Sequence, residues 1–344
     1  MMWSKLLYQE DGYLNMKGIL SVDVPFFFLW GGRGIGKTFG ALKYVLENDI
    51  RFMFMRRTQS QADLINKEEF SPFKPLNDYL HMDVRPRVIS KYNAALVDYV
   101  DGEPSNKVRG YTCALSTLSN MRGFDASDVE ILIWDEFIPE KHDRPIKNEG
   151  AAFLNAVETI GRNRELNGKP PLRVLCLANA NTLGNPIFLE LGIVNIAYRM
   201  AEQEKEIYIN RDRGLFLGNI MRSPISDKKE ETSLYKLARK ESEFTRMSLS
   251  NEFSGEEVGD IGSRPIREYN PICTIGEITI YRHKSRREYY VTELASGSPV
   301  TFTSGETDRK RFMKKYHFLY TAYLNNKVVF SSKLTQLLFD LYNK

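Results

Sequence analysis

Residues 26–38 read FFFLWGGRGIGKT, and this stretch decides how the chain folds and what it binds. The apolar run at its start predicts a short buried strand, which leads directly into the glycines. Residues 31–38 match G-x-x-x-x-G-K-[ST], the phosphate-binding loop, in the strand–loop–helix setting that this motif requires. We therefore predict that the chain binds ATP, or another nucleoside triphosphate, together with Mg²⁺.

The residue types of this loop each suit a phosphate ligand. Glycines allow successive backbone N–H groups to surround an anion, and the following helix turns its N-terminus toward the phosphates. Lys37 can reach the β- and γ-phosphates, while the Thr38 hydroxyl can ligate Mg²⁺. Upstream, Tyr8 either stacks on the adenine base or packs in the core. The predicted nucleotide-binding residues are Tyr8, Gly31, Gly32, Arg33, Gly34, Ile35, Gly36, Lys37 and Thr38.

A second apolar stretch, ILIWDEF at residues 131–137, predicts a buried strand that ends in two acids. Following a phosphate-binding loop, the first acid, Asp135, is expected to hold Mg²⁺. The second, Glu136, can act as the general base toward the attacking water. A third core strand over 172–178 ends at Asn179, which either contacts the γ-phosphate and its water or makes a turn.

The bulk composition is that of a globular protein with room for two domains. Hydrophobic residues make up 42% and charged residues 27% of the 344 residues, and the net charge is +4. No apolar run approaches the length of a membrane span, and the acidic residues near the N-terminus argue against a secretory signal. The three cysteines are far apart and odd in number, which favours a reducing cytosol and no metal cluster.

Alternating strands and helices with polar groups at strand ends predict an open α/β sheet. We expect an ATPase domain at 1–212, a linker or lid subdomain at 213–259 and a basic α+β domain at 260–344. A β-meander over 83–114 is inserted in the first, with a hairpin turn at Asp101-Gly102 and Pro86 at a sheet edge. Residues 260–344 hold 14 Lys and Arg against 8 Asp and Glu. That surplus suits a polyanionic partner or an ordinary solvated surface.

The chain resembles the DNA-packaging ATPases of phi-29-type small tailed bacteriophages, which are compact relatives of large terminase subunits. The resemblance rests on GGRGIGKT with its internal arginine, FMRR after the next strand, ILIWDEF, RNRE at 162–165 and CLANA at 176–180. SLSNEF at 248–253 is also similar. The resemblance is strong over about residues 1–200 and weaker, but in order, to the C-terminus.

This resemblance implies an additional-strand, conserved-glutamate (ASCE) ATPase that pumps double-stranded DNA into a procapsid. It implies a homo-oligomeric ring, a pentamer in the family, that sits on the portal or connector and in some cases on a structured RNA. The protein would work in the host cytoplasm, attached transiently to the procapsid and absent from the mature virion, without a membrane partner. The C-terminal domain would be a vestigial nuclease of ribonuclease H type, because the first candidate strand offers only Glu277 at its edge.

By residue match, Lys37 is the phosphate lysine, Asp135 the metal acid and Glu136 the catalytic glutamate. Arg162 is the arginine supplied to the neighbouring subunit's nucleotide, and Arg122 is a second candidate for a basic residue acting in trans. The alternative for Arg162 and Arg164 is a surface pair with Glu158 or Glu165.

Two other functions are compatible with a phosphate-binding loop: a nucleotide or small-molecule kinase, and a nucleic-acid-binding protein that uses nucleotide as a switch. The adjacent Asp135 and Glu136 favour water as the phosphate acceptor and therefore argue against both. Arg56 and Arg57, at the end of the second strand, face either phosphate or nucleic acid, or are a solvated pair.

Overall fold

A computed structural model describes residues 2–121, 123–140, 143–179, 182–220, 223–237, 260–294 and 297–343. The chain forms two compact units, Met1–Asn181 with Arg199–Ser254, and Thr182–Tyr198 with Gly255–Lys344. Among the described helices, none combines the length and apolar character that a membrane span needs.

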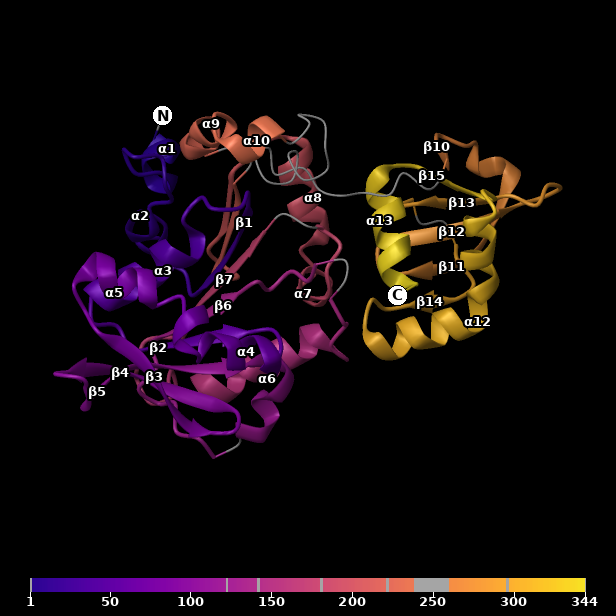
Figure 1. Ribbon diagram of the computed structural model, residues 1–344. Coiled ribbons are helices and arrows are strands. Elements are labelled where there is room, and N and C mark those ends of the chain that lie inside the picture. The colour runs from indigo at the N-terminus through magenta and orange to yellow at the C-terminus, as the bar shows by residue number, and fades with distance from the viewer. Residues whose placement is uncertain are drawn as a thin grey trace. The chain divides into compact units, whose positions relative to one another are not determined.

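The first unit is built on a single mixed sheet, shown in Figure 1. Its strands are β1 (Phe26–Gly31), β2 (Phe52–Arg56), β3 (Val84–Ser90), β4 (Asn93–Val100), β5 (Glu103–Ala114), β6 (Ile131–Asp135), β7 (Arg173–Asn179), β8 (Ile207–Asn210) and β9 (Leu215–Ile220). They lie in the order β3-β4-β5-β2-β6-β7-β1-β9-β8. The run from β5 to β9 is parallel throughout, so the carboxyl ends of these strands share one edge of the sheet.

Helices follow the strands and cover the sheet. They are α1 (Met2–Leu7), α2 (Met16–Leu20), α3 (Lys37–Glu47), α4 (Gln59–Ile65), α5 (Lys74–Leu80), α6 (Glu149–Gly161), α9 (Pro224–Glu230) and α10 (Ser233–Leu237), with 3₁₀ turns η1 (Glu68–Phe70) and η2 (Leu115–Met121). Helix α8 (Val194–Glu202) spans the point where the chain passes from the second unit back to the first.

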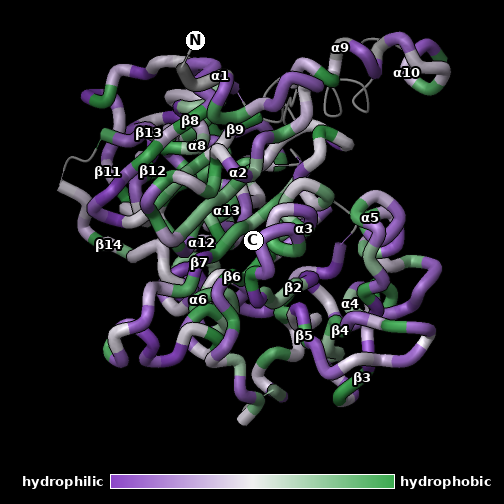
Figure 2. Tube along the Cα trace, turned by 90° about the vertical axis from the view of Figure 1, so that its left-hand side faces the viewer, coloured by the Kyte–Doolittle hydropathy of each residue, from purple (hydrophilic) through white to green (hydrophobic). Residues whose placement is uncertain are grey.

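Strand β1 is buried on both faces, as its unbroken apolar sequence predicts. Phe27 and Leu29 belong to the core cluster that includes the buried residues of α3. On the other face, the Phe28 ring lies 6.1 Å from that of Phe153 in α6, which stacks on Trp134 of β6 at 5.0 Å. Figure 2 shows hydrophobic residues concentrated in these central strands. The apolar side chains packed on the two faces of the sheet hold the carboxyl ends of β1 and β6 in place.

The predicted β-meander is confirmed as the three consecutive antiparallel strands β3, β4 and β5. The turn between β4 and β5 is Asp101-Gly102, and both residues have positive φ, 51° and 83°. This is the backbone that a two-residue hairpin with a right-handed twist requires. Pro86 lies in β3, the edge strand, where its missing N–H leaves no gap in a ladder.

The segment predicted as a linker, 213–259, begins instead with a core strand. Strand β9 is completely buried and pairs in parallel with β1 from Phe26↔Leu215 to Gly31↔Ile220. The charged residues that follow suggested a linker for the whole segment, although LFLGNI itself is apolar. Helices α9 and α10 come next, and residues 221, 222 and 238–259, including the SLSNEF motif, lie outside the described residues.

The second unit has a six-stranded mixed sheet in the order β10-β15-β13-β12-β11-β14. Helices α12 and α13 lie on its two faces in Figure 1. The bounds are α7 (Pro186–Glu190), β10 (Asp260–Ile261), the 3₁₀ turn η3 (Ile266–Glu268), β11 (Tyr269–Ile275), β12 (Ile278–His283), β13 (Tyr289–Thr292), β14 (Thr301–Phe302), α12 (Glu306–Leu324), β15 (Val328–Phe330) and α13 (Lys333–Tyr342). The likeness of this unit to a ribonuclease H-type nuclease stays a prediction.

Because β9 lies in the core, substitutions at two residues of the segment predicted as a linker should differ strongly in their effect on stability. Phe216 is fully buried with its ring 5.6 Å from that of Phe27, whereas Leu237 is 84% exposed. We expect Phe216→Ala to lower the free energy of unfolding by about 3–5 kcal/mol. Leu237→Ala, the matched control, should change it by less than about 0.5 kcal/mol. Urea unfolding followed by circular dichroism measures both, and equal effects would contradict the assignment of β9 to the core.

Candidate functional site

The glycine-rich loop joins β1 to α3 at the shared carboxyl edge of the sheet. Gly34 and Gly36 have φ of 65° and 88°, a conformation that other residues rarely adopt. A Cβ on Gly36 would lie 3.1 Å from Cδ1 of Tyr13, and the amide of Leu14 donates to the Ile35 carbonyl at 3.1 Å. The N-terminal segment therefore packs directly on the loop and supports its shape.

Lys37 is the first residue of α3, and its side chain is only 8% exposed. Its Nζ donates to the carbonyls of Gly31 and Gly32, at 3.1 and 2.6 Å, and to Oδ1 of Asn179 at 3.3 Å. Burial lowers the pKa of Lys37 to about 7, because the charged ammonium loses solvation. A phosphate in the loop would favour the charged form, so this position fits an anionic ligand.

Thr38 and Asp135 meet although a whole strand, β7, separates β1 from β6. The Thr38 hydroxyl donates to Oδ1 of Asp135 at 2.8 Å, and the acid is 8% exposed. Burial raises the pKa of Asp135, while the nearby Arg56 opposes that shift. A hydroxyl and a carboxylate side by side, next to a phosphate-binding loop, are the donors that Mg²⁺ uses when phosphates and water complete its shell. The residues present therefore fit the ion.

Glu136 follows the end of β6 with φ of 60°, an uncommon conformation for a residue other than glycine. This backbone turns the chain at the sheet edge and leaves the carboxylate half-exposed, at 46%. Burial of the remainder raises the pKa of Glu136, with Asp135 adding to the rise and Arg56 opposing it. Strained backbone of this kind concentrates at functional sites. An accessible carboxylate of raised pKa is suited to accept a proton from water.

Arg56, the last residue of β2, contacts both acids. Its Nη1 lies 2.7 Å from Oδ2 of Asp135 and 3.2 Å from Oε2 of Glu136. Its side chain is only 18% exposed, which argues against the solvated pair, whereas a contact of this residue with phosphate or nucleic acid stays a prediction. Sequence reasoning missed its role as the partner of the two acids. The signal was available, because β2 runs parallel beside β6 and ends at the same edge.

Arg57 has different partners from Arg56. Its burial argues against the solvated pair that was one of the alternatives for these two arginines. Its side chain is 1% exposed and bonds to Glu149, with Nε–Oε1 at 2.5 Å and Nη2–Oε2 at 2.9 Å. Oδ2 of Asp143 lies 3.9 Å from Nη1 of Arg57. Glu149 opens α6, where a carboxylate also suits the helix N-terminus. This buried bidentate pair ties the end of β2 to α6.

Of the remaining predicted residues, Asn179 lies at the tip of β7 and contacts Lys37, which places it in the site. The Tyr8 hydroxyl donates to Oε1 of Glu206 at 2.7 Å, and the residue is partly buried. Tyr13, which is 41% exposed, is an aromatic residue that packs directly against Gly36 of the loop. The adenine contact of Tyr8 stays a prediction that these positions do not support.

Arg162 ends α6 with φ of 43° and remains 44% exposed. It donates to the carbonyl of Phe124 and lies 3.7 Å from Asp125, so the predicted surface pair with Glu158 or Glu165 is not what it forms. Arg164 instead donates to the carbonyls of Pro170 and Val129. Neither arginine reaches the loop of its own subunit. Arg122 lies outside the described residues.

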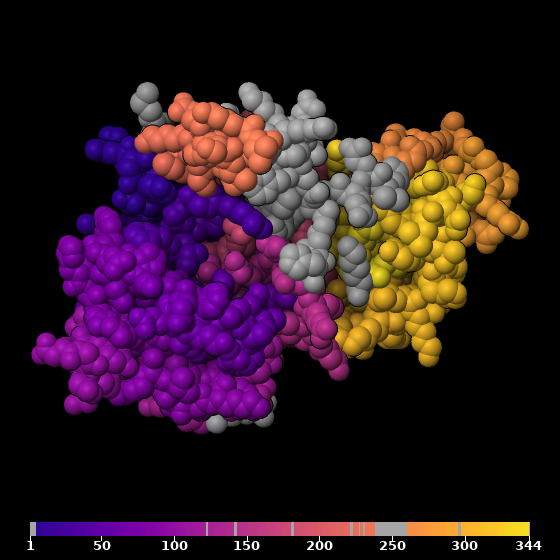
Figure 3. All heavy atoms as spheres, viewed as in Figure 1, coloured from indigo at the N-terminus to yellow at the C-terminus, as the bar shows by residue number. Residues whose placement is uncertain are grey.

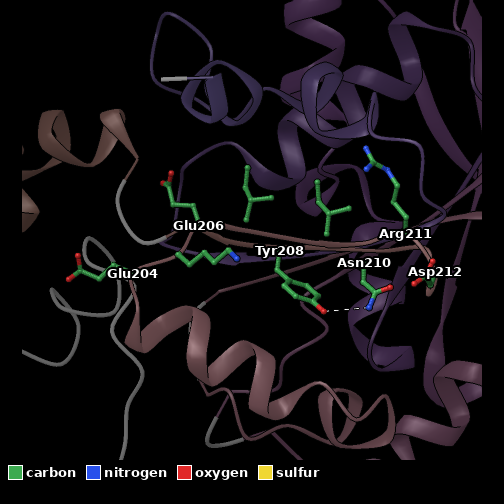
Figure 4. A pocket seen from close by; sticks show the side chains of 9 residues that line it. Glu204, Glu206, Tyr208, Asn210, Arg211 and Asp212 are labelled. Carbon is green, nitrogen blue, oxygen red and sulfur yellow. Dashed lines mark hydrogen bonds between the residues drawn. The ribbon is translucent and has the colours of Figure 1, made fainter.

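An open cleft of about 860 Å³ follows β8, the strand at the opposite edge from β3. Figure 4 shows Tyr208 beside Asn210, with Glu206 and Arg211 pointing away from the sheet. Its lining, residues 204–212, includes none of the predicted site residues. The phosphate-binding loop and the acids thus form a site separate from this cleft.

Comparison with known sequences identifies a family and several relatives. The family model described as Podovirus DNA encapsidation protein (Gp16) matches residues 8–269. The DNA packaging protein of Bacillus phage phi29 is 26% identical over 249 residues, which cover 71% of this chain and 67% of that protein. That of Bacillus phage B103 is 28% identical over 242 residues, covering 68% and 66%.

Two solved structures share the fold along nearly the whole chain. The Phi-28 gp11 DNA packaging motor has a TM-score of 0.62 at 19% identity, covering 96% of this chain and 98% of that one. The bacteriophage Phi-29 viral genome packaging motor assembly has a TM-score of 0.61 at 18% identity, covering 96% and 99%.

The buried Arg57–Glu149 pair predicts an asymmetric response to mutation. Glu149→Ala leaves a guanidinium buried without its partner and should lower the free energy of unfolding by about 3–5 kcal/mol. The double change Arg57→Met with Glu149→Leu removes both charges and should cost clearly less. Urea denaturation of the single and double variants measures this, and a double variant less stable than Glu149→Ala would contradict it.

Proposed function

Because the chain belongs to the Podovirus DNA encapsidation protein (Gp16) family, we propose that it is an ATP hydrolase that drives double-stranded DNA into a viral procapsid. The observation that carries the proposal is the convergence of Lys37, Thr38, Asp135 and Glu136 at one edge of a parallel sheet. Lys37 supplies a positive charge for the phosphates, Thr38 and Asp135 supply two oxygen ligands for a metal ion, and Glu136 supplies a base. Hydrolysis of a phosphoanhydride needs these groups.

The residues divide the chemistry among themselves. Lys37 binds the outer phosphates, and Thr38 and Asp135 would hold Mg²⁺, which would supply positive charge to neutralise the phosphate oxygens. Glu136 takes the proton of the attacking water. Arg56 holds both carboxylates in place and favours their ionised forms, because an adjacent positive charge stabilises the carboxylate. Asn179 lies beside Lys37, where a side-chain amide can contact phosphate or water.

The proposed motor is a ring of identical subunits, in which Arg162 serves the nucleotide of a neighbour. Its exposed position at the end of α6, away from its own loop, supports this role. A guanidinium is always charged and can bridge two phosphate oxygens. In the second unit, Lys284, Arg286 and Arg287 are exposed in the turn between β12 and β13. We propose that this unit docks on the portal, or on a structured RNA at the portal, of a procapsid in the host cytoplasm.

The proposal is tested by nucleotide hydrolysis with and without duplex DNA. We expect DNA to stimulate hydrolysis, Lys37→Ala to weaken ATP binding, and Glu136→Gln to bind ATP but not hydrolyse it, because an amide cannot accept the proton. Phosphate release and fluorescent-nucleotide titration measure the two steps. Phosphate transfer to a small acceptor would identify a kinase, and normal hydrolysis by Glu136→Gln would refute the assigned base.

The trans role of Arg162 predicts that two inactive variants restore each other. Arg162→Ala should hydrolyse ATP about 10³–10⁵-fold more slowly while still binding it. Mixed with Glu136→Gln, it should regain activity, because an intact Arg162 from one subunit serves an intact Glu136 in the next. Arg164→Ala is the matched control and should not need rescue. Full activity of Arg162→Ala alone, or no recovery in proven mixed rings, would exclude action in trans.

A further inference from the structure

Helix α9 packs beside the phosphate-binding loop and was not part of the predicted site. Its first residues lie against the turn at Gly12, where a Cβ would come within 2.9 Å of the Ile225 amide and 3.0 Å of Cβ of Pro224. Ile225 is 8% exposed and belongs to the same core cluster as Ile35 of the loop. Figure 3 shows α9 and α10 against the N-terminal segment. The helix is therefore anchored beside the loop by apolar contacts.

This anchoring places the Lys229 ammonium directly on the loop. Its Nζ donates to the carbonyl of Arg33, and a Cβ on Gly34 would overlap the same Nζ. Lys228, one residue earlier, points elsewhere: it is exposed, and its Nζ lies 3.4 Å from the carbonyl of Asp11. Two adjacent lysines on one short helix thus have different surroundings, and only the second reaches the phosphate-binding loop.

The charges around Lys229 favour an anion at this point. Burial lowers the pKa of Lys229, and no described carboxylate opposes that shift. Lys37 donates to the carbonyls of Gly31 and Gly32, and Lys229 donates to that of Arg33. Two ammonium groups of like charge therefore contact the same glycine loop and repel each other. A phosphate bound between them would replace this repulsion with two attractive contacts.

The side of the loop that Lys229 covers indicates which phosphates are involved. The Arg33 side chain bonds to Oε1 of Glu140 at 2.5 Å, and Glu140 lies four residues after Glu136 in the chain. This pair joins the apex of the loop to the segment that follows the general base. Lys37 reaches the β- and γ-phosphates from the helix side.

We propose that Lys229 is a second phosphate-binding lysine, which contacts the β- and γ-phosphates of ATP from α9 and stabilises the charge that develops during hydrolysis. The inference rests on the proposed function and assigns α9 to the same nucleotide site. The competing role is purely structural, with Lys229 capping the Arg33 carbonyl. Glutamine distinguishes the two, because its amide can still donate to a carbonyl but carries no charge.

The test is titration of the full-length protein with a non-hydrolysable ATP analogue and with ADP, supported by thermal melting without nucleotide. We expect Lys229→Gln to weaken binding of the analogue about tenfold or more, since a charge-assisted bond is lost, and to weaken ADP binding less. Lys229→Arg should retain most of the affinity. Lys228→Gln is the matched control and should bind within about twofold of the wild type.

The possible results separate a phosphate-binding role of Lys229 from a purely structural one. Unchanged affinity in Lys229→Gln, or an equal loss in Lys228→Gln, would overturn the proposal. Unchanged affinity of Lys229→Gln, with an unchanged melting temperature without nucleotide, would assign the structural role instead, because the amide still donates to the carbonyl. Lys37→Ala serves as the reference for a lost phosphate contact. If the wild-type protein itself bound no ATP, the proposed function would fail, which is a different outcome from failure of Lys229 alone.

Discussion

The hydrogen bond between Thr38 and Asp135 is the contact on which the functional site depends. It joins the residue after the glycine loop to the last residue of β6, and β7 lies between the two strands. The bond can form only because the three strands are held in a fixed register. Gly31 pairs with Asn179 and Asp135 pairs with Leu177, so β6 ends two residues before the level that β1 and β7 reach. The phosphate lysine, the metal acid and the base are therefore brought together by the alignment of parallel strands and by the glycine loop that follows β1.

Sequence alone predicted the parts of this fold whose signal is local. The glycine loop, the two acids and the Asp101-Gly102 hairpin each follow from a few adjacent residues with restricted backbone or chemistry. The strand β9 was missed because it is defined by pairing with a distant part of the chain. Its partner β1 lies about 190 residues earlier, and the residues next to β9 in sequence are charged. The surroundings of Tyr8 were left open for the same reason, since its hydroxyl binds Glu206, a residue 198 positions later in the chain.

The arginines at the end of β2 show a further limit of reading motifs. As adjacent residues of an extended chain, Arg56 and Arg57 point to opposite sides, which the sequence does predict. Which carboxylates receive them depends on tertiary packing. Arg56 meets Asp135 and Glu136, while Arg57 meets Glu149 at the start of α6, the helix that ends at Arg162. The same short stretch thus touches the catalytic acids and supports the helix that carries the exposed arginine.

The position of β1 between β7 and β9 has a consequence for how the protein is made. The strand leaves the ribosome early, but its second neighbour in the sheet ends at Ile220. Until that residue is synthesised, a highly apolar strand has an unpaired edge, which is the kind of segment that associates wrongly with other chains. Pairing over so long a separation is also slow. The sheet beside the phosphate-binding strand therefore closes only after Ile220 has been made, and we expect the yield of folded protein to fall as the concentration of newly made chains rises.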